Sequence, residues 1–594
     1  MCGIAGRILG EEERISRADV LKMQSLMRHR GPDGGGTYWG DRVALTMRRL
    51  SIIDIAGGNQ PLFNEDRSVV LVGNGEIYNY KELRDELRKK GHHLKTRSDI
   101  ETVAHLYEDL ELKFVEKLRG MFALAIYDKR RQKVILVRDR LGEKPLYWTM
   151  VGRGLAFASE LKVLVNMEWT KKKLDPLAID SFFHYYYVPE PKTMFVDIHK
   201  LPPASMLVID LKTMDIEQTK YWRPEEIVPT DRGDLTGEIR DVFRESCELT
   251  LRSDVPVGVA LSGGVDSGSI LSLAAPAYRG NLKAFSIGYE GTPPRDERQK
   301  AKWLAKRYGV KFIEKEIKHQ EVVESFPQLI YEGDDPIADI AGYGIHSVSK
   351  LAHENQVPVL LGGLGGDELF WGYSWTSQAI EQSLRLRRMC FFDLNKGFEM
   401  ADSFIRQLYT KDLAGEIKSH ADATKDLEWK NNETSVAKMG MDLIRDVWLV
   451  SNCIDQNERL SMANSVELRS PFLDYKLTEL ILGSRQAINA YNKPEKYWLK
   501  KAMKGILPDE VMRRKKQGFT PPVSIWIMKI LRSYIPLIRG GFLVRENILD
   551  ERKVEWLART WMAMPLNWYA LYQIVLLEIW GREYYYGQSP EELR

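Results

Sequence analysis

Strand and helix signals alternate between about residues 255 and 361, and this alternation limits the possible folds more than any other feature of the sequence. Short apolar runs predict strands, whereas apolar residues spaced three and four apart predict helices. The predicted strands cover 255–260, 282–289 and 357–361, and the predicted helices cover 265–275, 297–309 and 345–355. Such alternation is typical of an α/β doubly wound parallel sheet. From about residue 380 onward the sequence predicts a mostly helical part.

The first third of the chain has a different pattern, in which β-prone runs follow one another with few helices between them. These runs are VVLVG (69–73), MFALAIYD (121–128) and KVILVRD (133–139). One charged helical segment, KELRDELRKKG (81–91), separates two of them. The pattern predicts a largely antiparallel, α+β arrangement. A proline pair and a polar, turn-rich stretch around 200–235 mark a boundary, so we expect two domains, residues 1–215 and 216–594.

Composition excludes several classes of protein. The net charge is only +3 over 594 residues, which gives no general reason to expect nucleic acid or an acidic membrane surface as a partner. The 4 cysteines lie far apart and form no CxxC pair, so neither a disulfide framework nor a zinc site is indicated. The most apolar segment, WYALYQIVLLEIW (568–580), contains Glu578 and predicts a buried helix. Without a signal-peptide pattern, we expect a cytoplasmic protein that uses neither membrane nor nucleic acid.

Two glycine-rich loops each follow a predicted strand. SGGVDS (262–267) opens a helix, and its glycines let backbone N–H groups approach an anion closely. GGLGGDELFWGY (362–373) follows the strand VPVLL and carries Asp367. Because ligands bind at the carboxyl ends of strands in a doubly wound sheet, both loops are expected to face one nucleotide. Asp266 and Asp367 supply the hard oxygen ligands that Mg²⁺ prefers.

The second residue of the chain, Cys2, has a property that no other cysteine position offers. If Met1 is removed, the thiol and the free α-amine belong to one residue, and the amine can act as the base that activates the nucleophile. Turns rich in Gly, Asn, Asp and Arg accompany it in the first hundred residues: RHRGPDG (28–34), RRLSIID (48–54), GNGEIYNY (73–80) and RSDIE (97–101). Together they are suited to bind an amino acid by its carboxylate and ammonium and to form an oxyanion hole.

These motifs resemble a known family. MCGIAG, RHRGPD, RLSIID, NGEIYN and SD-x-E resemble the class II glutamine amidotransferase domain, an N-terminal-nucleophile hydrolase sandwich. SGGVDS resembles the pyrophosphate loop of ATP-pyrophosphatases. The synthetase domain of glutamine-hydrolysing asparagine synthetases is similar in four motifs: SGGVDS, the GDE loop, VELRSPFLD (466–474) and RKKQGF (514–519). The match extends from residue 2 to about residue 520. It implies an α+β sandwich followed by an α/β domain with a helical C-terminal part.

The resemblance also implies roles for individual residues. Cys2 would be the nucleophile, and Asn74 with Gly75 would form the oxyanion hole. Arg49 would bind the glutamine carboxylate, and Glu76 and Asp99 its ammonium. The implied glutamine-binding residues are Arg49, Leu50, Ser51, Ile52, Ile53, Asn74, Gly75, Glu76 and Asp99. The implied ATP-binding residues are Leu261, Ser262, Gly263, Gly264, Asp266, Ser267, Ile287, Gly362 and Gly363, and the implied Mg²⁺ ligands are Asp266 and Asp367.

The implied reaction is the glutamine-dependent amidation of a carboxylic acid, driven by cleavage of ATP to AMP and pyrophosphate. Cys2 releases ammonia from glutamine, ATP adenylates the acid, and ammonia that crosses an internal tunnel displaces AMP. Glu467 matches a family acid/base residue, and Lys516 matches a lysine that stabilises the acyl-adenylate. Homodimers are common in the family. The mechanism requires removal of Met1, which a small second residue permits.

Several positions depart from the family pattern, and two of them leave the acceptor open. Leu364 replaces an acidic residue linked to adenylate formation, and Ile340 lies about where asparagine synthetases have an aspartate-binding arginine. The His-Glu pair of a common HERLSI pattern is Met47-Arg48, and Gly362 replaces a serine. The acceptor is therefore aspartate or another carboxylate, such as a natural-product, sugar uronic or cell-wall acid. A glutaminase with a regulatory, non-ligating second domain is a further alternative. Retention of Cys2 argues against intramolecular amide formation.

Overall fold

Two antiparallel sheets form the first part of the protein. The computed structural model describes residues 2–10, 14–291, 296–390, 403–417, 429, 432–514, 521–563 and 567–594. Sheet A has the spatial order β10 (Ile198–Lys200), β8 (Tyr147–Val151), β9 (Gly154–Ala158), β1 (Cys2–Ile8), β3 (Val43–Arg49) and β2 (Gly34–Trp39). Sheet B has the order β12 (Ile216–Lys220), β11 (Ser205–Asp210), β7 (Lys133–Arg138), β6 (Gly120–Asp128), β5 (Val69–Ile77) and β4 (Leu62–Phe63). The antiparallel pairing predicted from the sequence is confirmed.

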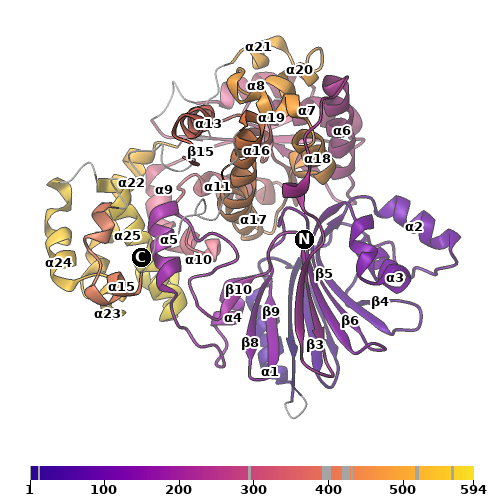
Figure 1. Ribbon diagram of the computed structural model, residues 1–594, viewed down its shortest axis with the longest axis horizontal. Helices are drawn as coiled ribbons and strands as arrows, with labels where there is room; N and C mark the ends of the chain where they lie inside the picture. The colour runs from indigo at the N-terminus through magenta and orange to yellow at the C-terminus, as the bar shows by residue number, and fades with distance from the viewer. Residues whose placement is uncertain are drawn as a thin grey trace.

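The two sheets pack face to face through one buried apolar cluster, to which strands of both contribute (Figure 1). Successive residues of a strand point to opposite faces of its sheet, and both faces of these sheets are largely apolar. One apolar face of each sheet can therefore pack against the other sheet. Helices α1 (Arg17–Leu26) and α4 (Leu161–Val165) contact sheet A, whereas α2 (Tyr80–Lys89) and α3 (Glu101–Leu110) lie together, and α3 contacts β4 and β5 of sheet B. The buried residues of α2 fall at positions i, i+3, i+4 and i+7, so one face of this charged helix enters the core.

A five-stranded parallel sheet forms the centre of the second part, as the alternating pattern predicts. Its order is β15 (Lys311–Ile317), β14 (Lys283–Tyr289), β13 (Val257–Ala260), β16 (Val359–Leu361) and β17 (Glu467–Arg469). From β13 the sheet extends through β14 and β15 on one side and through β16 and β17 on the other. The strand order therefore reverses between β13 and β16. In an open α/β sheet the crevice at such a reversal, beyond the carboxyl ends of the strands, is the usual place for a ligand.

Helices surround this sheet and make up most of the remaining chain. Those between α4 and α13 are α5 (Pro176–Tyr185), α6 (Leu235–Thr250), α7 (Val265–Ala277), α8 (Arg298–Arg307), α9 (His319–Glu324), α10 (Phe326–Gly333), α11 (Gly342–Glu354) and α12 (Gly366–Leu369). Next come α13 (Ser374–Leu386), α15 (Lys411–Glu416), α16 (Glu433–Leu443), the π-helix η4 (Ile444–Ile454), α17 (Asp455–Met462), α18 (Tyr475–Leu482), α19 (Arg485–Ile488), α20 (Tyr497–Ala502) and α21 (Asp509–Met512). The last are α22 (Val523–Tyr534), α23 (Phe542–Arg545), α24 (Glu551–Thr560) and α25 (Trp568–Trp580).

Helix α25 is buried, as its sequence predicts, and Glu578 explains how a carboxylate is tolerated there. Glu578 is fully buried, yet its oxygens accept hydrogen bonds from the backbone N–H groups of Phe542 and Leu543 at 2.7 and 3.0 Å. Arg582 adds a third hydrogen bond at 2.6 Å. A buried charge is tolerated only when it is paired and hydrogen-bonded in this way. In the described part of the chain, no helix has the length and apolarity needed to cross a membrane.

The two parts share a buried core. One apolar cluster includes side chains of sheet B and α3 together with side chains of α6 and β13. Strand β12, at 216–220, pairs with β11 and so continues sheet B beyond the boundary expected at 215/216. Figure 1 places the beginning of β1 at the end of the sheets that faces the second part. The first residues of the chain therefore lie at the junction between the two parts.

Candidate functional site

The backbone nitrogen of Cys2 is held by a side chain of sheet B. Cys2 starts β1 opposite Arg49 of β3, and only 6% of the residue is exposed. Its nitrogen donates a hydrogen bond of 2.9 Å to Oδ1 of Asn74. Burial raises the pKa of the Cys2 thiol, so a base is needed to form the nucleophilic thiolate at neutral pH. Removal of Met1 would turn the Asn74-bound nitrogen into an α-amine within the same residue.

Asn74 and Gly75, on β5, have the properties expected of an oxyanion hole. Asn74 is fully buried, and its Nδ2 has no hydrogen-bond partner among the described residues. A buried donor without a partner is costly unless a ligand uses it. Gly75 has φ of 149°, and a Cβ atom built on it would lie 2.0 Å from the carbonyl oxygen of Met121. Only glycine fits this strand position without moving β6.

Two acidic side chains, Glu76 and Asp99, are buried near this strand. Oδ2 of Asp99 accepts a hydrogen bond from the N–H of Ile77 at 2.8 Å, and burial raises the pKa of Asp99 to about 6. Burial and the charge of Asp99 raise the pKa of Glu76. Oε2 of Glu76 pairs with Nη2 of Arg469 at 3.2 Å, whereas its Oε1 has no hydrogen-bond partner in the part of the chain described. An ammonium group would satisfy this oxygen and favour both ionised carboxylates.

The guanidinium of Arg49 organises the loop that follows β3. Its terminal nitrogens donate to the carbonyl oxygens of Ile53, Asp54 and Ile55 at 3.0, 2.7 and 3.1 Å. A further hydrogen bond of 3.0 Å goes to Oδ1 of Asn59. The other glutamine-site residues expected from the sequence lie on the same loop: Leu50, Ser51, Ile52 and Ile53. The structure thus shows Arg49 shaping the predicted glutamine-binding loop.

A cavity of about 280 Å³ lies where the loops after β13 and β16 meet. Eight of the nine expected ATP-binding residues line it: Leu261, Ser262, Gly263, Gly264, Asp266, Ser267, Ile287 and Gly363. Gly362 does not line the cavity, and its N–H donates to the carbonyl oxygen of Arg469 at 2.8 Å. Asp367, the second expected metal ligand, lines the cavity with Asp266. Tertiary structure therefore brings the two glycine-rich loops together, as their positions after parallel strands predict.

The sequence did not single out the lysine that joins these two carboxylates. Lys496, just before α20, forms an ion pair of 2.7 Å with Oδ1 of Asp367 and pairs with Asp266. Burial opposes its charge, but the two carboxylates raise its pKa above the usual value. Further cavity-lining residues that the sequence did not identify are Glu297, Lys300, Lys500 and Arg514. Arg514 lies in the RKKQGF motif, whereas the other four lie in ERQK (297–300) and EKYWLKKA (495–502), whose mixed charge is shared by surface helices.

The departures from the family pattern lie in apolar surroundings. Leu364 packs against a buried cluster that includes Leu449 and Leu473, and Ile340, 8% exposed, belongs to another apolar cluster. Glu467 is fully buried at the first residue of β17, does not line the nucleotide cavity, and pairs with Arg469. Burial opposes ionisation of Glu467, but neighbouring positive charges, including Arg469, lower its pKa overall. Lys516 lies outside the described residues.

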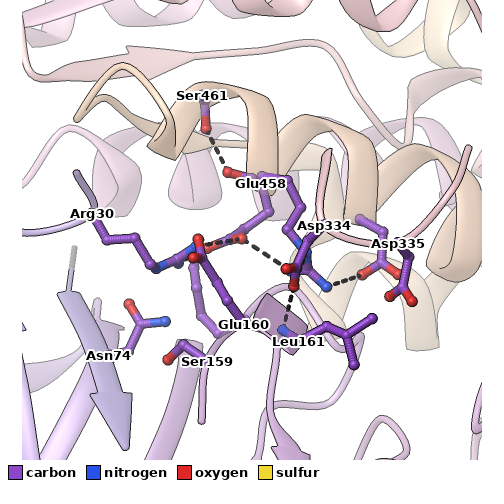
Figure 2. A network of polar contacts seen from close by, with 12 residues as sticks. Arg30, Asn74, Ser159, Glu160, Leu161, Asp334, Asp335, Glu458 and Ser461 are labelled. Carbon is purple, nitrogen blue, oxygen red and sulfur yellow. Dashed lines mark hydrogen bonds and ion pairs between the residues drawn. The ribbon is translucent and has the colours of Figure 1, made fainter. Parts of the chain in front are cut away.

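Buried ion pairs connect the two parts beside Cys2 (Figure 2). Nε of Arg30 donates to the carbonyl oxygen of Cys2 at 3.1 Å. The same guanidinium contacts Oε1 of Glu160 at 3.0 Å and Oε2 of Glu458, on α17, at 3.2 Å. Arg30 and Glu160 are at most 1% exposed, and Glu458 is 5% exposed. One arginine thus touches both the predicted nucleophile and a helix of the second part.

A small cavity of about 20 Å³ also lies at the junction of the two parts. Tyr78, close to Glu76, lines it from the first part, and Ser470 and Leu473 line it from the second. Leu473 packs in the same cluster as Leu364, and the hydroxyl of Ser470 donates to the carbonyl oxygen of Leu364. The cavity thus lies between the Glu76 region and the loop after β16.

Comparisons with known proteins match both parts of the chain. Residues 1–222 match a glutamine amidotransferase domain family, and residues 238–582 match the asparagine synthase family. Asparagine synthetase [glutamine-hydrolyzing] 1 of Bacillus subtilis (strain 168) is 33% identical over 90% of this chain and 89% of its own length. Asparagine synthetase [glutamine-hydrolyzing] 3 of the same organism is 28% identical over 92% of each chain.

A search of solved structures found glutamine phosphoribosylpyrophosphate amidotransferase from B. subtilis, which covers 61% of this chain and 82% of its own, with 15% identity and a TM-score of 0.28. That similarity is too low to support an argument. The asparagine synthase match extends over more than half of the chain, and the first of the two relatives aligns with nine-tenths of it. The chain belongs to the asparagine synthetase family.

Proposed function

We propose that the protein is a glutamine-dependent ligase that amidates a carboxylic acid with cleavage of ATP to AMP and pyrophosphate. The observation that carries this proposal is that one chain holds two separate sites: Cys2 held by Asn74 in the first part, and the cavity between the β13 and β16 loops in the second. Family membership supports the same reaction. We assign the glutaminase to the first part and the synthetase to the second, with the division in the segment 221–234 that separates β12 from α6.

In the glutaminase site, Cys2 would attack the side-chain amide of glutamine while its own α-amine takes the thiol proton. Nδ2 of Asn74 and the N–H of Gly75 would stabilise the oxyanion of the tetrahedral intermediate. The carboxylates of Glu76 and Asp99 would hold the glutamine ammonium, and the loop shaped by Arg49 would enclose its carboxylate end. Collapse of the intermediate breaks the C–N bond and releases ammonia, and water then frees the glutamate from the thioester.

In the synthetase site, a carboxylate oxygen of the acceptor would attack the α-phosphorus of ATP, and pyrophosphate would leave. The backbone N–H groups of SGGVDS and the start of α7 are suited to bind the phosphates. The donor set fits Mg²⁺, because Asp266 and Asp367 come from two loops and converge on one ammonium, that of Lys496, in this structure. When bound there, Mg²⁺ would neutralise charge on the leaving pyrophosphate. Ammonia would then attack the acyl carbon and displace AMP.

Aspartate is the acceptor that we propose, with asparagine as the product. Leu364 and Ile340 have hydrocarbon side chains that pack with apolar clusters, so neither can supply a charge to the acceptor. Its carboxylates would instead need the cationic groups that line the cavity, among them Lys300, Lys496 and Arg514.

Pyrophosphate release from ATP, measured with glutamine and a panel of acids led by aspartate, tests the proposal. Aspartate should trigger release together with equimolar asparagine. Asp266→Asn, which removes one carboxylate from the cavity, should stop release while glutamine hydrolysis continues. If another acid triggers release and aspartate does not, aspartate is wrong as the acceptor but the ligase reaction stands. If no acid in the panel triggers pyrophosphate release, the protein behaves as a glutaminase whose second domain is regulatory. That result would contradict the ligase.

A further inference from the structure

Four side chains of types that can bind a metal lie close together where the β4–β5 turn, the end of α2 and helix α3 meet. Figure 1 shows α2 and α3 together at one side of the molecule. Glu65 lies in the turn between β4 and β5, His92 follows the end of α2, and His105 and Glu108 lie on α3. The last two are three residues apart, so they share one helix face. One ligand atom from each of the four lies within 4.8 Å of the other three. Three segments distant in sequence therefore present two imidazoles and two carboxylates to one point.

Both imidazoles turn the same nitrogen toward the centre of this cluster. Nδ1 of His92 lies 3.0 Å from Oε1 of Glu65, and Nδ1 of His105 lies 3.1 Å from Oε2 of the same carboxylate. Oε2 of Glu108 is oriented by the side-chain amide of Asn64 at 3.1 Å. Only 1% of His105 is exposed, so packing fixes the position of its ring.

The outer nitrogens of both rings face a second layer of carboxylates. Nε2 of His92 lies 3.1 Å from Oδ1 of Asp109, and Nε2 of His105 lies 3.9 Å from Oε1 of Glu101. Glu101 is itself held by the backbone N–H groups of Lys95 and Thr96 at 2.6 and 2.8 Å. In metal sites, a carboxylate on the outer nitrogen fixes the tautomer whose lone pair points at the ion. His92 has that arrangement. At His105 the 3.9 Å separation from Glu101 is too long for a hydrogen bond, and Nε2 of His105 has no hydrogen-bond partner among the described residues.

We propose that Glu65, His92, His105 and Glu108 form a structural site for a divalent transition metal, with Zn²⁺ as the best fit. Imidazole nitrogens and carboxylate oxygens both bind zinc, in tetrahedral geometry with bonds of about 2.0–2.2 Å. Such a tetrahedron has ligand-to-ligand distances of roughly 3.3 Å. The contacts of 3.0 and 3.1 Å go to the two oxygens of Glu65, and the four ligand atoms lie within 4.8 Å of one another, so the wider separations would shorten when the metal binds.

The metal would join the β4–β5 turn, the end of α2 and the middle of α3. Helix α3 begins two residues after Asp99, one of the carboxylates assigned to glutamine, and Glu101 in its first turn contacts His105. Fixing α3 therefore stabilises the segment that carries Asp99, at a site distinct from the nucleophile and the nucleotide cavity. The site stands independently of the proposed ligase reaction, because its ligands take no part in either chemistry.

Zinc binding by the full-length protein tests this site. After removal of metals with a chelator, Zn²⁺ is titrated against a chromophoric competitor. One tight zinc per chain is expected, and X-ray absorption should show two imidazole ligands. His92→Gln should weaken zinc binding by more than the 10–100-fold typical of losing an outer-layer partner, and Asp109→Asn should weaken it by about 10–100-fold. Zinc should also raise the melting temperature of the parent protein but not that of His92→Gln.

Neighbouring residues supply matched controls. His93→Gln changes the next histidine, whose imidazole is not one of the four ligands, and should leave zinc affinity unchanged. Cys2→Ala and Asp266→Asn should each retain the same zinc, because the thiol and the nucleotide-site carboxylates lie elsewhere. Any of three results would overturn the proposal. These are a parent protein that binds no stoichiometric zinc, equal effects of His92→Gln and His93→Gln, and loss of the zinc in Cys2→Ala or Asp266→Asn. His92→Gln and Asp109→Asn alter partly exposed side chains and should fold, so the test does not depend on changing buried His105.

Discussion

Asn74 shows how one side chain can serve two parts of a reaction. Its Oδ1 accepts the hydrogen bond from the Cys2 nitrogen, and its buried Nδ2 is left for a ligand. An amide is the side chain that offers an acceptor and a donor on one rigid plane. Aspartate at this position would lack the donor. In the reaction that we propose, the position of the nucleophile and the stabilisation of the oxyanion would therefore depend on the same residue.

The first prediction concerns Cys2→Ala. Glutamine-dependent synthesis should fall by more than about 10³-fold, because removing a nucleophile leaves only residual catalysis. Synthesis supported by ammonium salts should persist, because the synthetase cavity does not include Cys2. The two rates are measured as pyrophosphate release with each nitrogen donor. Loss of both activities together would contradict two separate sites.

The second prediction concerns the pH dependence of glutamine use. Burial raises the pKa of Asp99 to about 6, so its carboxyl is ionised above that pH and neutral below it. A neutral Asp99 cannot pair with the glutamine ammonium, and KM for glutamine should rise as the pH falls through about 6. Ammonia-dependent synthesis, corrected for the ammonia present at each pH, is the control and should lack this change in KM. In Asp99→Asn, KM should be high at every pH, and an unchanged inflection in this variant would rule out Asp99 as its source.

At the scale of elements, strand β5 determines the glutaminase site more than any single loop does. It pairs with β6 along its whole length and carries Asn74, Gly75 and Glu76 on consecutive positions. Successive side chains of a strand point to opposite faces, but Gly75 has none, so its position can adopt a φ of 149° that redirects the local backbone. Asn74 and Glu76 therefore flank a residue without a side chain, whose backbone lies directly against β6.

The third prediction compares Gly75→Ala with Gly91→Ala. Both glycines have positive φ, but a Cβ at Gly75 would meet the Met121 carbonyl oxygen at 2.0 Å, whereas nothing lies within 4 Å of one at Gly91. Gly91→Ala should cost only the backbone strain of about 1–2 kcal/mol and leave glutamine hydrolysis intact. Gly75→Ala should cost more and abolish hydrolysis. Urea unfolding and glutaminase assays measure the two effects, and equal losses in both variants would exclude the close contact as the cause.

At the scale of the whole molecule, the junction between the two parts contains buried charged side chains. Arg30 and Glu458 pair across the junction, and Lys200 of β10 pairs with Asp455 of α17 at 2.6 Å. Such pairs add little stability compared with apolar packing, but breaking one leaves an uncompensated buried charge. They also fix orientation, because each ion must meet a specific partner. We infer that the network sets the relative position of the two sites.

The fourth prediction concerns this junction. Arg30→Met removes one buried partner from both Glu160 and Glu458, which keep Lys162 and Arg459 respectively. The variant should therefore be destabilised by less than the roughly 3–5 kcal/mol that a fully unpaired buried charge costs. Adding Glu458→Met to that variant removes one of the two charges and should recover part of the loss. Ammonia-dependent synthesis should survive better than glutamine-dependent synthesis, because Arg30 also contacts the Cys2 carbonyl. Chemical denaturation of the parent protein, of the single variants Arg30→Met and Glu458→Met, and of the double variant provides the measurement. Additive losses would show that Arg30 and Glu458 do not interact energetically.

Local periodicity and motif order by themselves determined the classes of sheet, the two glycine-rich loops and the place of Cys2, because these depend on residues close together in sequence. The buried α25 and the meeting of the β13 and β16 loops follow from the same local patterns. Only the tertiary structure decided the partners of isolated charged residues. Lys496 reaches Asp266 and Asp367, and Arg469 reaches Glu76, across hundreds of residues. A lysine or arginine has the same sequence signal on a solvated helix as in a buried ion pair, and only the packing of distant elements distinguishes the two.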